Sequence, residues 1–553
     1  MTIVAMNPAA ELAVTSMNEL CEILGVPTTS LHVRAGLDPA CELRAPVASG
    51  RSPFGEPVDE RFVSVRTGDA LEVRACTAQG AFRGLVHELL LTPHACGSDD
   101  QGEETPRSGA VETAPTDRDG HACHDGPAIA WRGLSVDTVR HPLEVSTLRR
   151  IVDLLALHGM NVLHLHLTDN EGWRAPVGGV RAPGASPFTV EELRDLVAYA
   201  QRRFVAIVPE IDLPGHIAAL AQARPELTAR SFPYAALAYL DPDNPEALAF
   251  AQASIAELAA IFLAPYLHIG GDEVYGMPRE AYDRFIRAAT DAVHATGRQA
   301  ITWQEGVRSE AAIDLYQWWM TPADIPDEAA ILRQAPEGME DVARAVAASY
   351  AQVADDPRLL AEREAEVIVS VQNPLYLDRR YAEPSHCRAQ TEALERVGFA
   401  AYAPTPTHAL LSWDPHAALP AGTTLAGVEA AIWGETISSV DDLALLLLPR
   451  LALVAEAAWR QQPSPDRTGS VVERAAAHWS TLGFHGWYRS TDLLEAGSPH
   501  ATSAHPSTSP AGPISPSSTA SSSNVTSPSN VTSPSNVAPP TSTSPDQERH
   551  PHG

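Results

Sequence analysis

The sequence predicts an α/β protein: a (β/α)8 TIM barrel preceded by a small α/β (α+β) domain and followed by a disordered C-terminal tail. Three observations lead to this fold class. Between residues 129 and 490, short apolar strand patterns alternate with amphipathic helical patterns, as they do in parallel sheets. This stretch holds eight strand patterns, which favours a closed barrel over an open doubly wound sheet. The 553 residues are 44% hydrophobic and 20% charged, which is typical of a globular protein.

Four regions follow one another along the chain. Residues 1–95 combine short strand and helix patterns and predict a small N-terminal domain. Residues 96–128 are polar, acidic and rich in Gly, Pro and Thr, which predicts a linker or long loop. Residues 129–490 form the predicted barrel. Residues 491–553 are mostly Ser, Thr, Pro, Asn and His and hold too few apolar side chains to fold, so we expect a disordered tail.

Within these regions the individual elements follow from periodicity. In the N-terminal domain, residues 62–65 and 70–75 are expected to pair as strands, and residues 80–90 carry a helical period. The acidic segment 320–365 has a helical pattern and is the largest insertion, between the sixth and seventh barrel strands. The eight predicted barrel strands span residues 131–137, 161–167, 204–210, 266–271, 299–303, 312–317, 366–371 and 425–432.

Charge and composition exclude several classes of partner. The formal net charge of −30 disfavours binding to nucleic acid or to an anionic membrane surface. No apolar run approaches the ~20 residues that cross a membrane, and the first residues show no secretory signal pattern. We therefore expect a cytoplasmic protein, with secretion still open if translation starts further upstream. The six cysteines form no Cys-x-x-Cys pair, so we expect reduced thiols and no metal cluster.

Polar and aromatic side chains recur where the predicted barrel strands end. In a (β/α)8 barrel the chemistry lies at these C-terminal ends. Aromatic rings pack on the apolar faces of sugars, while carboxylates and Arg bind sugar hydroxyls. The pattern therefore predicts a sugar-binding pocket. Its members are Arg132 near the start of the first strand and, at or after the strand ends, Asp169, His216, Asp272, Glu273, Trp303, Trp319, Tyr376, Asp378, Trp433 and Glu435.

The adjacent acids Asp272 and Glu273 are the most informative of these residues. They follow an apolar strand through Gly270 and Gly271. Two neighbouring carboxyls at a buried strand end repel each other and are costly to desolvate. Such a pair is useful where one carboxyl must hold a proton while the other stays ionised, as in glycoside hydrolysis.

Each of these features also has a simpler interpretation. A single Trp such as Trp303 or Trp319 is more often part of a core, and Arg132 is compatible with an ordinary ion pair inside the barrel. Asp169 and Glu435 are compatible with helix caps. His164 and His166 share a strand face and suggest a metal-dependent hydrolase, but the chain has no Lys and its fifth and sixth strands end in Trp, so we expect no metal. A carbohydrate-binding barrel without catalysis is the other alternative.

An ordered series of motifs resembles glycoside hydrolase family 20, the β-N-acetylhexosaminidases. The resemblance covers about residues 129–460, and the N-terminal region is also similar to the small domain that precedes the barrel in that family. The departures are Asn170 and Glu171 after Asp169, the short loop after Arg174, and the unusual segment 320–365. The motifs are Trp131-Arg132-Gly133-Leu134 with Asp137 and Arg140-His141, His164–Asp169 with Gly172-Trp173-Arg174, Pro209–Asp212 with Pro214-Gly215-His216, His268–Glu273, Tyr376-Leu377-Asp378, Trp413-Asp414-Pro415, Trp433-Gly434-Glu435, Pro449-Arg450, and Ala455-Glu456 with Trp459.

The resemblance implies a role for each site residue. It implies an exo-acting, retaining enzyme without a cofactor or metal, in which the substrate's own acetamido oxygen is the nucleophile. Glu273 would be the general acid and base, and Asp272 would orient the acetamido group and stabilise the charge that develops on it. The remaining roles are hydrogen bonding of the acetamido oxygen (Tyr376), tuning of Glu273 (Asp169, His216), and substrate binding (Arg132, Trp303, Trp319, Asp378, Trp413, Trp433, Glu435).

The implied partner is an oligosaccharide or glycoconjugate that contains N-acetylhexosamine. The resemblance implies no particular oligomeric state and no preference between N-acetylglucosamine and N-acetylgalactosamine.

Overall fold

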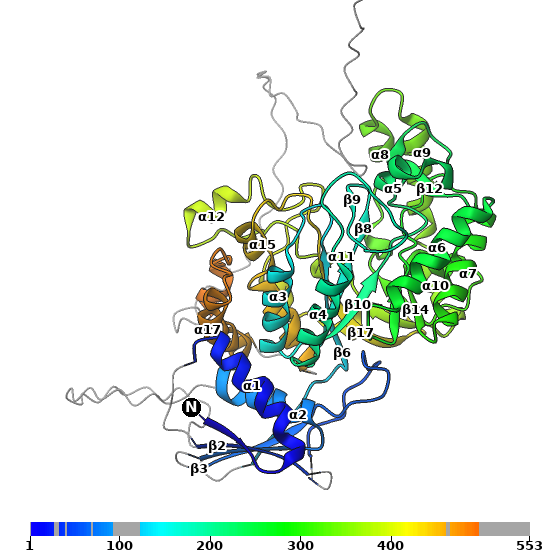
Figure 1. Cartoon of the computed structure of the whole chain (residues 1–553). Coiled ribbons are helices and arrows are strands. Elements are labelled where there is room, and N and C mark those ends of the chain that lie inside the picture. The colour runs from blue at the N-terminus through cyan, green and yellow to red at the C-terminus, as the bar shows by residue number, and fades with distance from the viewer. Residues whose placement is uncertain are drawn as a thin grey trace, which may run out of the picture.

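The computed structural model describes residues 2–26, 32–38, 41, 43–67, 70–91, 122–460 and 465–496. Figure 1 shows a small N-terminal domain below a larger barrel, with two helices of an insertion standing above the barrel. Among the described residues, no helix combines the length and the apolar character needed to cross a membrane. In the part of the chain that the structure describes, Cys21, Cys41, Cys76 and Cys387 form no disulfide.

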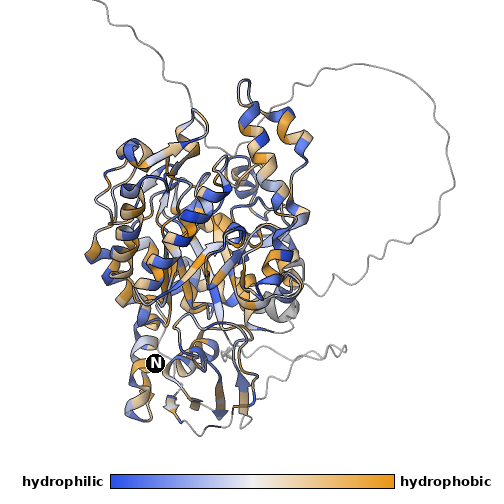
Figure 2. Ribbon diagram, turned by 90° about the vertical axis from the view of Figure 1, so that its right-hand side faces the viewer, coloured by the Kyte–Doolittle hydropathy of each residue, from blue (hydrophilic) through white to orange (hydrophobic). Residues whose placement is uncertain are grey.

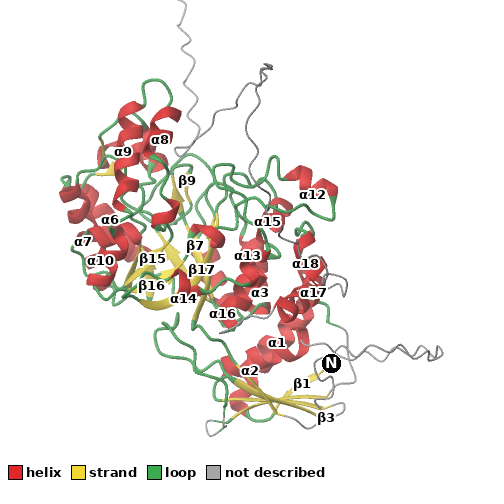
Figure 3. Cartoon of the chain, turned by 180° about the vertical axis from the view of Figure 1, so that it is seen from behind, coloured by secondary structure: helices red, strands yellow, loops and turns green. Residues whose placement is uncertain are grey.

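The N-terminal domain is a five-stranded sheet with two helices on one face. The strand order is β1-β2-β4-β3-β5, and β3 and β4 pair antiparallel as predicted. Figure 3 shows α1 and α2 between this sheet and the barrel. Thr77 caps α2 by accepting a hydrogen bond from the backbone N–H of Gly80. The elements are β1 (Thr2–Ala5), α1 (Glu11–Ile23), β2 (His32–Leu37), β3 (Phe62–Thr67), β4 (Ala70–Ala75), α2 (Ala78–Val86) and β5 (Ala122–Asp125).

The structure corrects two predicted domain boundaries. The predicted linker 96–128 is wrong at its end, because β5 lies inside it and pairs antiparallel with β3 as the fifth strand of the N-terminal sheet. The predicted tail 491–553 begins too early, because α18 covers Thr491–Ala496. Residues 96–121 and 497–553 lie outside the described residues.

The main domain is a closed barrel of eight parallel strands, which confirms the predicted fold class. The strand order around the barrel is β10-β13-β14-β15-β16-β17-β6-β7. Every predicted barrel strand is present, with ends shifted by a few residues. The strands are β6 (Trp131–Asp137), β7 (Val162–His166), β10 (Ala206–Glu210), β13 (Tyr266–His268), β14 (Gln299–Trp303), β15 (Leu315–Trp318), β16 (Glu366–Val369) and β17 (Thr424–Ile432).

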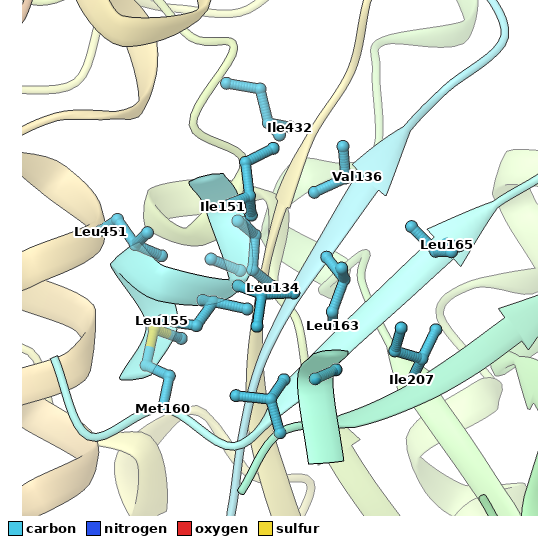
Figure 4. Close-up of a cluster of buried hydrophobic side chains, with 14 of the residues drawn as sticks. Leu134, Val136, Ile151, Leu155, Met160, Leu163, Leu165, Ile207, Ile432 and Leu451 are labelled. Carbon is cyan, nitrogen blue, oxygen red and sulfur yellow. The ribbon is translucent and has the colours of Figure 1, made fainter. Parts of the chain in front are cut away.

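Amphipathic helices surround the barrel. Figure 2 shows hydrophilic and hydrophobic segments alternating along them. In Figure 4, outward-pointing residues of β6, β7 and β10 meet Ile151, Leu155 and Leu451 from the covering helices. The larger helices around the barrel are α3 (Val145–Leu157), α4 (Val190–Gln201), α6 (Pro245–Ala259), α7 (Arg279–Ala295), α10 (Asp356–Glu362), α15 (Val440–Leu447), α16 (Arg450–Trp459) and α17 (Pro465–Thr481).

The barrel interior changes from apolar to polar along the strands. Near the strand starts, Trp131, Val162, Tyr266 and their neighbours form a separate buried apolar cluster. One layer further along, the interior holds buried polar groups, which are His164, His268, Glu210, Gln317 and Glu429. Burial of polar groups is tolerated where they bond to one another, and here His164 Nδ1 lies 2.7 Å from Glu429 Oε1. This polar layer supports the strand ends from below.

The insertion between β15 and β16 is helical, as predicted from its pattern. It contains α8 (Glu328–Gln334), α9 (Glu340–Gln352) and α10. Val342 and Val346 of α9 pack against Leu237, which ends the short 3-10 helix η4 (Ala235–Leu237), and against Tyr275 in the turn after β13. Figure 3 shows α8 and α9 above the strand ends, on the side away from the N-terminal domain. The insertion therefore contributes to the face where the predicted site residues lie.

Candidate active site

A cavity opens at the C-terminal ends of the barrel strands. It lies at the end of the barrel opposite the N-terminal domain, where a (β/α)8 barrel carries its chemistry. Carboxylates, two histidines and aromatic rings share its wall. The lining residues are Arg140, His166, Asp169, Asp212, His216, Asp272, Glu273, Trp319, Tyr376, Phe399, Tyr402, Trp433 and Glu435.

Glycine backbone conformations place the acidic pair. Gly270 has φ +73°, and a Cβ on it would lie 1.8 Å from Asp212 Oδ1, so only Gly fits between β13 and that carboxylate. The Gly271 N–H donates to Asp212 Oδ1 at 3.2 Å. Glu273 has φ +50°, a left-handed conformation that is strained for a residue with a side chain. The tight turn after β13 therefore directs Asp272 and Glu273 into the cavity.

His216 connects Asp169 with the acidic pair. Its Nδ1 lies 3.2 Å from Asp169 Oδ1, and its Nε2 lies 3.6 Å from Glu273 Oε2 and 3.8 Å from Asp272 Oδ2. Burial alone would lower the pKa of His216, but Asp169 and Asp212 outweigh it and raise the pKa well above its usual value. We therefore assign His216 a positive charge in the free protein.

The pKa values of the two neighbouring carboxyls shift in opposite directions. Burial alone would raise the pKa of Glu273, but the His216 imidazolium and a hydrogen bond from Tyr275 outweigh it and hold the pKa below its usual value. Burial and the nearby Asp212 raise the pKa of Asp272 well above its usual value. The two shifts therefore favour a proton on Asp272 over one on Glu273.

Two tyrosines also contact Glu273 or its surroundings. The Tyr275 hydroxyl donates to Glu273 Oε1 at 2.7 Å. Tyr350, which belongs to α9 of the insertion, lies with its hydroxyl 3.5 Å from that of Tyr275. The insertion is thus connected to Glu273 through two side chains.

Aromatic side chains form the opposite wall and the base of the cavity. The Trp319 and Tyr376 rings are nearly parallel, with centroids 6.2 Å apart. Trp433 meets Tyr376 edge-on and lies 5.9 Å from Trp303, which is buried beneath it. Trp303 Nε1 donates to Glu210 Oε1 at 2.8 Å, so Trp303 supports the cavity from the polar layer below. Apolar ring faces of this kind suit the C–H faces of a sugar.

Asp378, Arg140 and Glu435 are charged residues beside this aromatic wall. Asp378 is buried, and neither of its carboxylate oxygens has a hydrogen-bond partner. Burial and the nearby Glu435 raise its pKa well above the usual value. Arg140 contacts Asp169 Oδ2 at 2.7 Å and Glu435 Oε1 at 3.6 Å. Buried polar atoms without partners are costly, so the Asp378 oxygens are ready acceptors for the hydroxyls of a bound ligand.

Comparison with known proteins identifies the family. The family model described as "Glycosyl hydrolase family 20, catalytic domain" matches residues 129–279 and 275–462. The chain belongs to glycosyl hydrolase family 20. A β-N-acetylhexosaminidase of Cellulomonas fimi is 30% identical over 536 residues, which cover 91% of this chain and 94% of that protein. A β-hexosaminidase of Akkermansia muciniphila is 35% identical over 29% of this chain and 37% of that protein.

Solved structures agree with this assignment. The family 20 β-N-acetylhexosaminidase of Streptomyces coelicolor A3(2) superimposes with a TM-score of 0.65 at 25% identity, over 88% of this chain and 93% of that one. The Streptomyces plicatus N-acetyl-β-hexosaminidase bound to Thio-NAglucal has a TM-score of 0.64 at 24% identity, over 89% and 92% of the two chains. This family 20 protein is therefore a glycoside hydrolase with the barrel fold of those enzymes.

Eight of the twelve sequence-predicted residues line the cavity of this family 20 hydrolase. Trp303 and Asp378 are buried next to its wall without lining it, and two others lie elsewhere. Arg132 is wrong as a sugar ligand. It lies near the start of β6, at the opposite end of the barrel, where its Nη2 donates to Glu60 Oε1 and Oε2 at 2.9 and 2.8 Å. Trp413 is also wrong, because it packs against the main apolar core and does not line the cavity. The residues that line the cavity as predicted are Asp169, His216, Asp272, Glu273, Trp319, Tyr376, Trp433 and Glu435.

The predicted site omits residues that the structure brings to the cavity or next to Glu273, among them Arg140, Asp212, Tyr275 and Tyr350. Arg140 lines the cavity in which Arg132 was predicted to bind the sugar. The sequence feature that indicates Arg140 is its position just after the end of β6. Asp212 also follows a strand end. Tyr275 lies two residues after Glu273, which no spacing rule marks as a contact. Tyr350 arrives from the insertion, and no local pattern predicts that approach.

Several histidines and carboxylates of the described barrel also have metal-ligand spacing. In one of these groups, His166 lies between two carboxylates, with Nδ1 2.5 Å from Glu210 Oε2 and Nε2 2.8 Å from Asp169 Oδ2. Protein partners thus already engage both of its ring nitrogens. The groups are His164 with Glu210 and His268, His166 with Glu210 and Asp212, and Asp212 with His216 and Asp272.

Proposed function

We propose that this enzyme is an exo-acting β-N-acetylhexosaminidase. It removes terminal non-reducing N-acetylglucosamine or N-acetylgalactosamine from oligosaccharides or glycoconjugates, with retention of configuration. Family membership and the names of the relatives support the reaction class. One observation supports this proposal most directly. Asp272 lies beside Glu273 in a cavity lined by Tyr376 and Trp433, and the Asp272 Oδ1 atom is buried without a hydrogen-bond partner.

The first step forms a ring within the substrate. The acetamido oxygen attacks the anomeric carbon while the bond from that carbon to the leaving oxygen breaks, and Glu273 donates its proton to the leaving oxygen. The unpartnered Asp272 Oδ1 accepts a hydrogen bond from the acetamido N–H and stabilises the positive oxazolinium charge. The Tyr376 hydroxyl orients the attacking oxygen. Intramolecular attack benefits from a high effective molarity.

The second step reverses these roles. Glu273, now ionised, takes a proton from a water molecule that attacks the anomeric carbon from the face vacated by the leaving group. The bond from that carbon to the acetamido oxygen breaks, and the acetamido group is restored. Two inversions at one carbon leave its configuration retained.

Substrate binding must move the proton within the acidic pair. In the empty cavity the pKa of Asp272 is raised and that of Glu273 is lowered. An acetamido N–H at Asp272 favours its ionised form, because hydrogen bonds to a carboxylate stabilise the charge. Loss of the proton from Asp272 leaves Glu273 as the neighbouring acceptor. The two carboxyls therefore titrate as a coupled pair.

Three charged residues account for recognition of the terminal sugar. Asp378 offers buried oxygens without partners, and Glu435 and Arg140 lie beside the same part of the cavity. Carboxylates that accept from hydroxyls, together with an Arg that donates to them, give directional contacts to a sugar ring. These contacts suit a chain end with free hydroxyls, which supports exo action.

Release of 4-nitrophenol from 4-nitrophenyl β-N-acetylglucosaminide tests the proposal. We expect Glu273→Gln to lower kcat/KM by about 10²–10⁴-fold, because the variant has no proton to transfer. In the same assay Asp272→Asn should lower turnover and weaken inhibition by a thiazoline mimic of the intermediate about tenfold or more, because a charged hydrogen bond is lost.

Equal rates for wild type and Glu273→Gln would overturn the assignment. Unchanged thiazoline inhibition of Asp272→Asn would overturn substrate assistance alone. Full activity after dialysis against a chelator is expected, and loss of activity that added metal restores would favour the metal-dependent alternative.

A further inference from the structure

A second cavity adjoins the active site under the helical insertion. Its volume is about 190 Å³. Most of its wall comes from α8, α9 and the loop between them, with further residues from the loops after β15 and β16. The lining residues are Glu273, Trp319, Met320, Asp324, Ile331, Gln334, Ala335, Pro336, Met339, Val342, Ala343, Val346, Tyr350, Gln372, Phe399, Ala401 and Tyr402.

The two cavities meet at the catalytic acid. Glu273, Trp319, Phe399 and Tyr402 belong to the walls of both. In the proposed reaction Glu273 contacts the oxygen that joins the sugar to its leaving group. With the sugar among Asp272, Tyr376 and Trp433, the leaving group lies on the other side of Glu273. The second cavity occupies that side.

The wall of this cavity offers aromatic rings but few hydrogen-bond partners to a second sugar. Only Glu273, Asp324, Gln334 and Gln372 among its lining residues carry a carboxylate or amide. Asp324 Oδ2 already accepts from the backbone N–H and the hydroxyl of Thr321, at 2.9 and 2.6 Å. The hydroxyls of a sugar need hydrogen-bond partners when they leave water, whereas an apolar group gains by leaving it.

We propose that this cavity binds the leaving group of the substrate and selects an apolar one, an aryl or long alkyl group. The proposal rests on the proposed function, since it takes Glu273 as the acid at the glycosidic oxygen. Ile331 and Met339 are half-buried residues of the insertion on its wall, and they pack against the apolar cluster that holds Val342 and Val346. The insertion thus acts as a specificity element for the group that departs.

Alkyl glycosides of equal reactivity test this selection. Methyl and octyl β-N-acetylglucosaminide release alcohols of similar acidity, so a difference in kcat/KM reports binding of the chain. We expect the wild-type enzyme to favour the octyl glycoside by about tenfold or more. N,N′-diacetylchitobiose, whose leaving group is a second sugar, should rank below the octyl glycoside.

Variants on α8 and at the start of α9 provide a matched comparison. Ile331→Ser and Met339→Ser should each lower the octyl-to-methyl ratio at least about threefold while leaving kcat/KM for the methyl glycoside unchanged. Leu332→Ser alters a half-buried residue of the same helix that does not line the cavity, so the ratio should stay at the wild-type value.

The outcomes separate the two proposals. Cleavage of the methyl glycoside with no gain for the octyl chain, or equal ratios for Ile331→Ser and Leu332→Ser, would overturn the apolar cavity alone. A strong preference for the disaccharide would show that a second sugar occupies it. Failure to cleave any of the three substrates would overturn the proposed function itself.

Discussion

At the residue scale, the charge balance around Glu273 is unusual for a catalytic acid. Its carboxylate accepts a hydrogen bond from Tyr275 and faces the His216 imidazolium, and both favour the ionised form. A general acid must nevertheless hold a proton when the substrate is bound. The pKa of Glu273 is therefore set by a balance between burial and these two neighbours, and removing one neighbour should shift it.

Tyr275→Phe should move the pH profile toward higher pH. The substitution removes a donor to the ionised carboxylate, so the pKa of Glu273 rises toward the value that burial favours. Activity that needs protonated Glu273 is lost as pH rises through this pKa, so the basic limb of kcat/KM should shift up by about one unit. The measurement is kcat/KM from pH 4 to 9 for the methyl glycoside, whose poor leaving group depends on acid catalysis.

A leaving group that needs no protonation provides the control. With 2,4-dinitrophenyl β-N-acetylglucosaminide, the basic limb for the first step should be weaker in both proteins and the shift correspondingly smaller. A uniform fall in rate at every pH would indicate that Tyr275 only supports the turn after β13. An unmoved limb with the methyl glycoside would contradict the tuning role.

At the element scale, the sequence predicts the barrel well because its strands are buried apolar runs. Trp131–Asp137 and Gln299–Trp303 coincide with predicted strands, since hydrophobic runs bounded by polar turns mark both ends. β5 (Ala122–Asp125) was missed because Ala-Cys-His-Asp shows no alternating apolar pattern and is a strand only through its pairing with β3. Tertiary pairing, which local pattern does not encode, decided that element.

The candidate site was predictable to the extent that strand ends carry it. Reading residues at strand ends places Asp169, Asp272 and Glu435 together because a barrel brings all eight ends to one face. The same rule excludes Arg132, which lies at a strand start. Contacts made by the insertion, such as that of Tyr350 of α9 with Tyr275, depend on how the insertion packs on the barrel.

Gly270 at the end of β13 should be intolerant of a side chain. Ala at this position needs φ near +73° and places its Cβ within 1.8 Å of Asp212 Oδ1. Strain and overlap together should cost about 2–5 kcal/mol of unfolding free energy and displace the acidic pair. Gly179→Ala, where φ is +60° and nothing lies within 4 Å, isolates the strain and should cost only about 1 kcal/mol.

Urea unfolding and kcat should be measured on both glycine variants. Activity should fall sharply only for Gly270→Ala. Equal stabilities for the two variants would show that Asp212 moves aside without cost, and the close approach would then not be the reason for Gly at this position.

At the scale of the whole molecule, a buried ion cluster joins the N-terminal domain to the barrel. Glu60 accepts from Arg132 of β6 and from Arg83 of α2, whose Nε lies 2.9 Å from Glu60 Oε1. Arg83 also donates to the Phe204 carbonyl at 2.9 Å, on the loop before β10. All three charged side chains are almost fully buried. Arg132 is therefore part of domain docking, at the opposite end of the barrel from catalysis.

Arg132→Ala should destabilise the protein without changing the active site. Removing Arg132 leaves the buried Glu60 with one arginine, Arg83, and a hydrogen bond from Gln79. Breaking a buried ion pair costs about 3–5 kcal/mol. Arg140→Ala, the matched change at the other end of β6, should instead raise KM, because Arg140 lines the sugar cavity. Urea unfolding at pH 7 together with KM for 4-nitrophenyl β-N-acetylglucosaminide distinguishes the two arginines.

The pH dependence of the unfolding free energy is a second test of the ion cluster of Glu60, Arg83 and Arg132. Burial alone would raise the pKa of Glu60, but Arg132 and Arg83 outweigh it and lower the pKa below 4.5. A lowered pKa in the folded state contributes stability above about pH 4.5 that is lost as pH falls through the folded value. Without Arg132 this contribution shrinks, so the stability gap between wild type and Arg132→Ala should narrow below pH 4.5. If the difference in unfolding free energy between the two proteins stays constant from pH 7 to pH 3, Arg132 stabilises the interface by packing alone. A raised KM for Arg132→Ala would show that Arg132 does contribute to sugar binding.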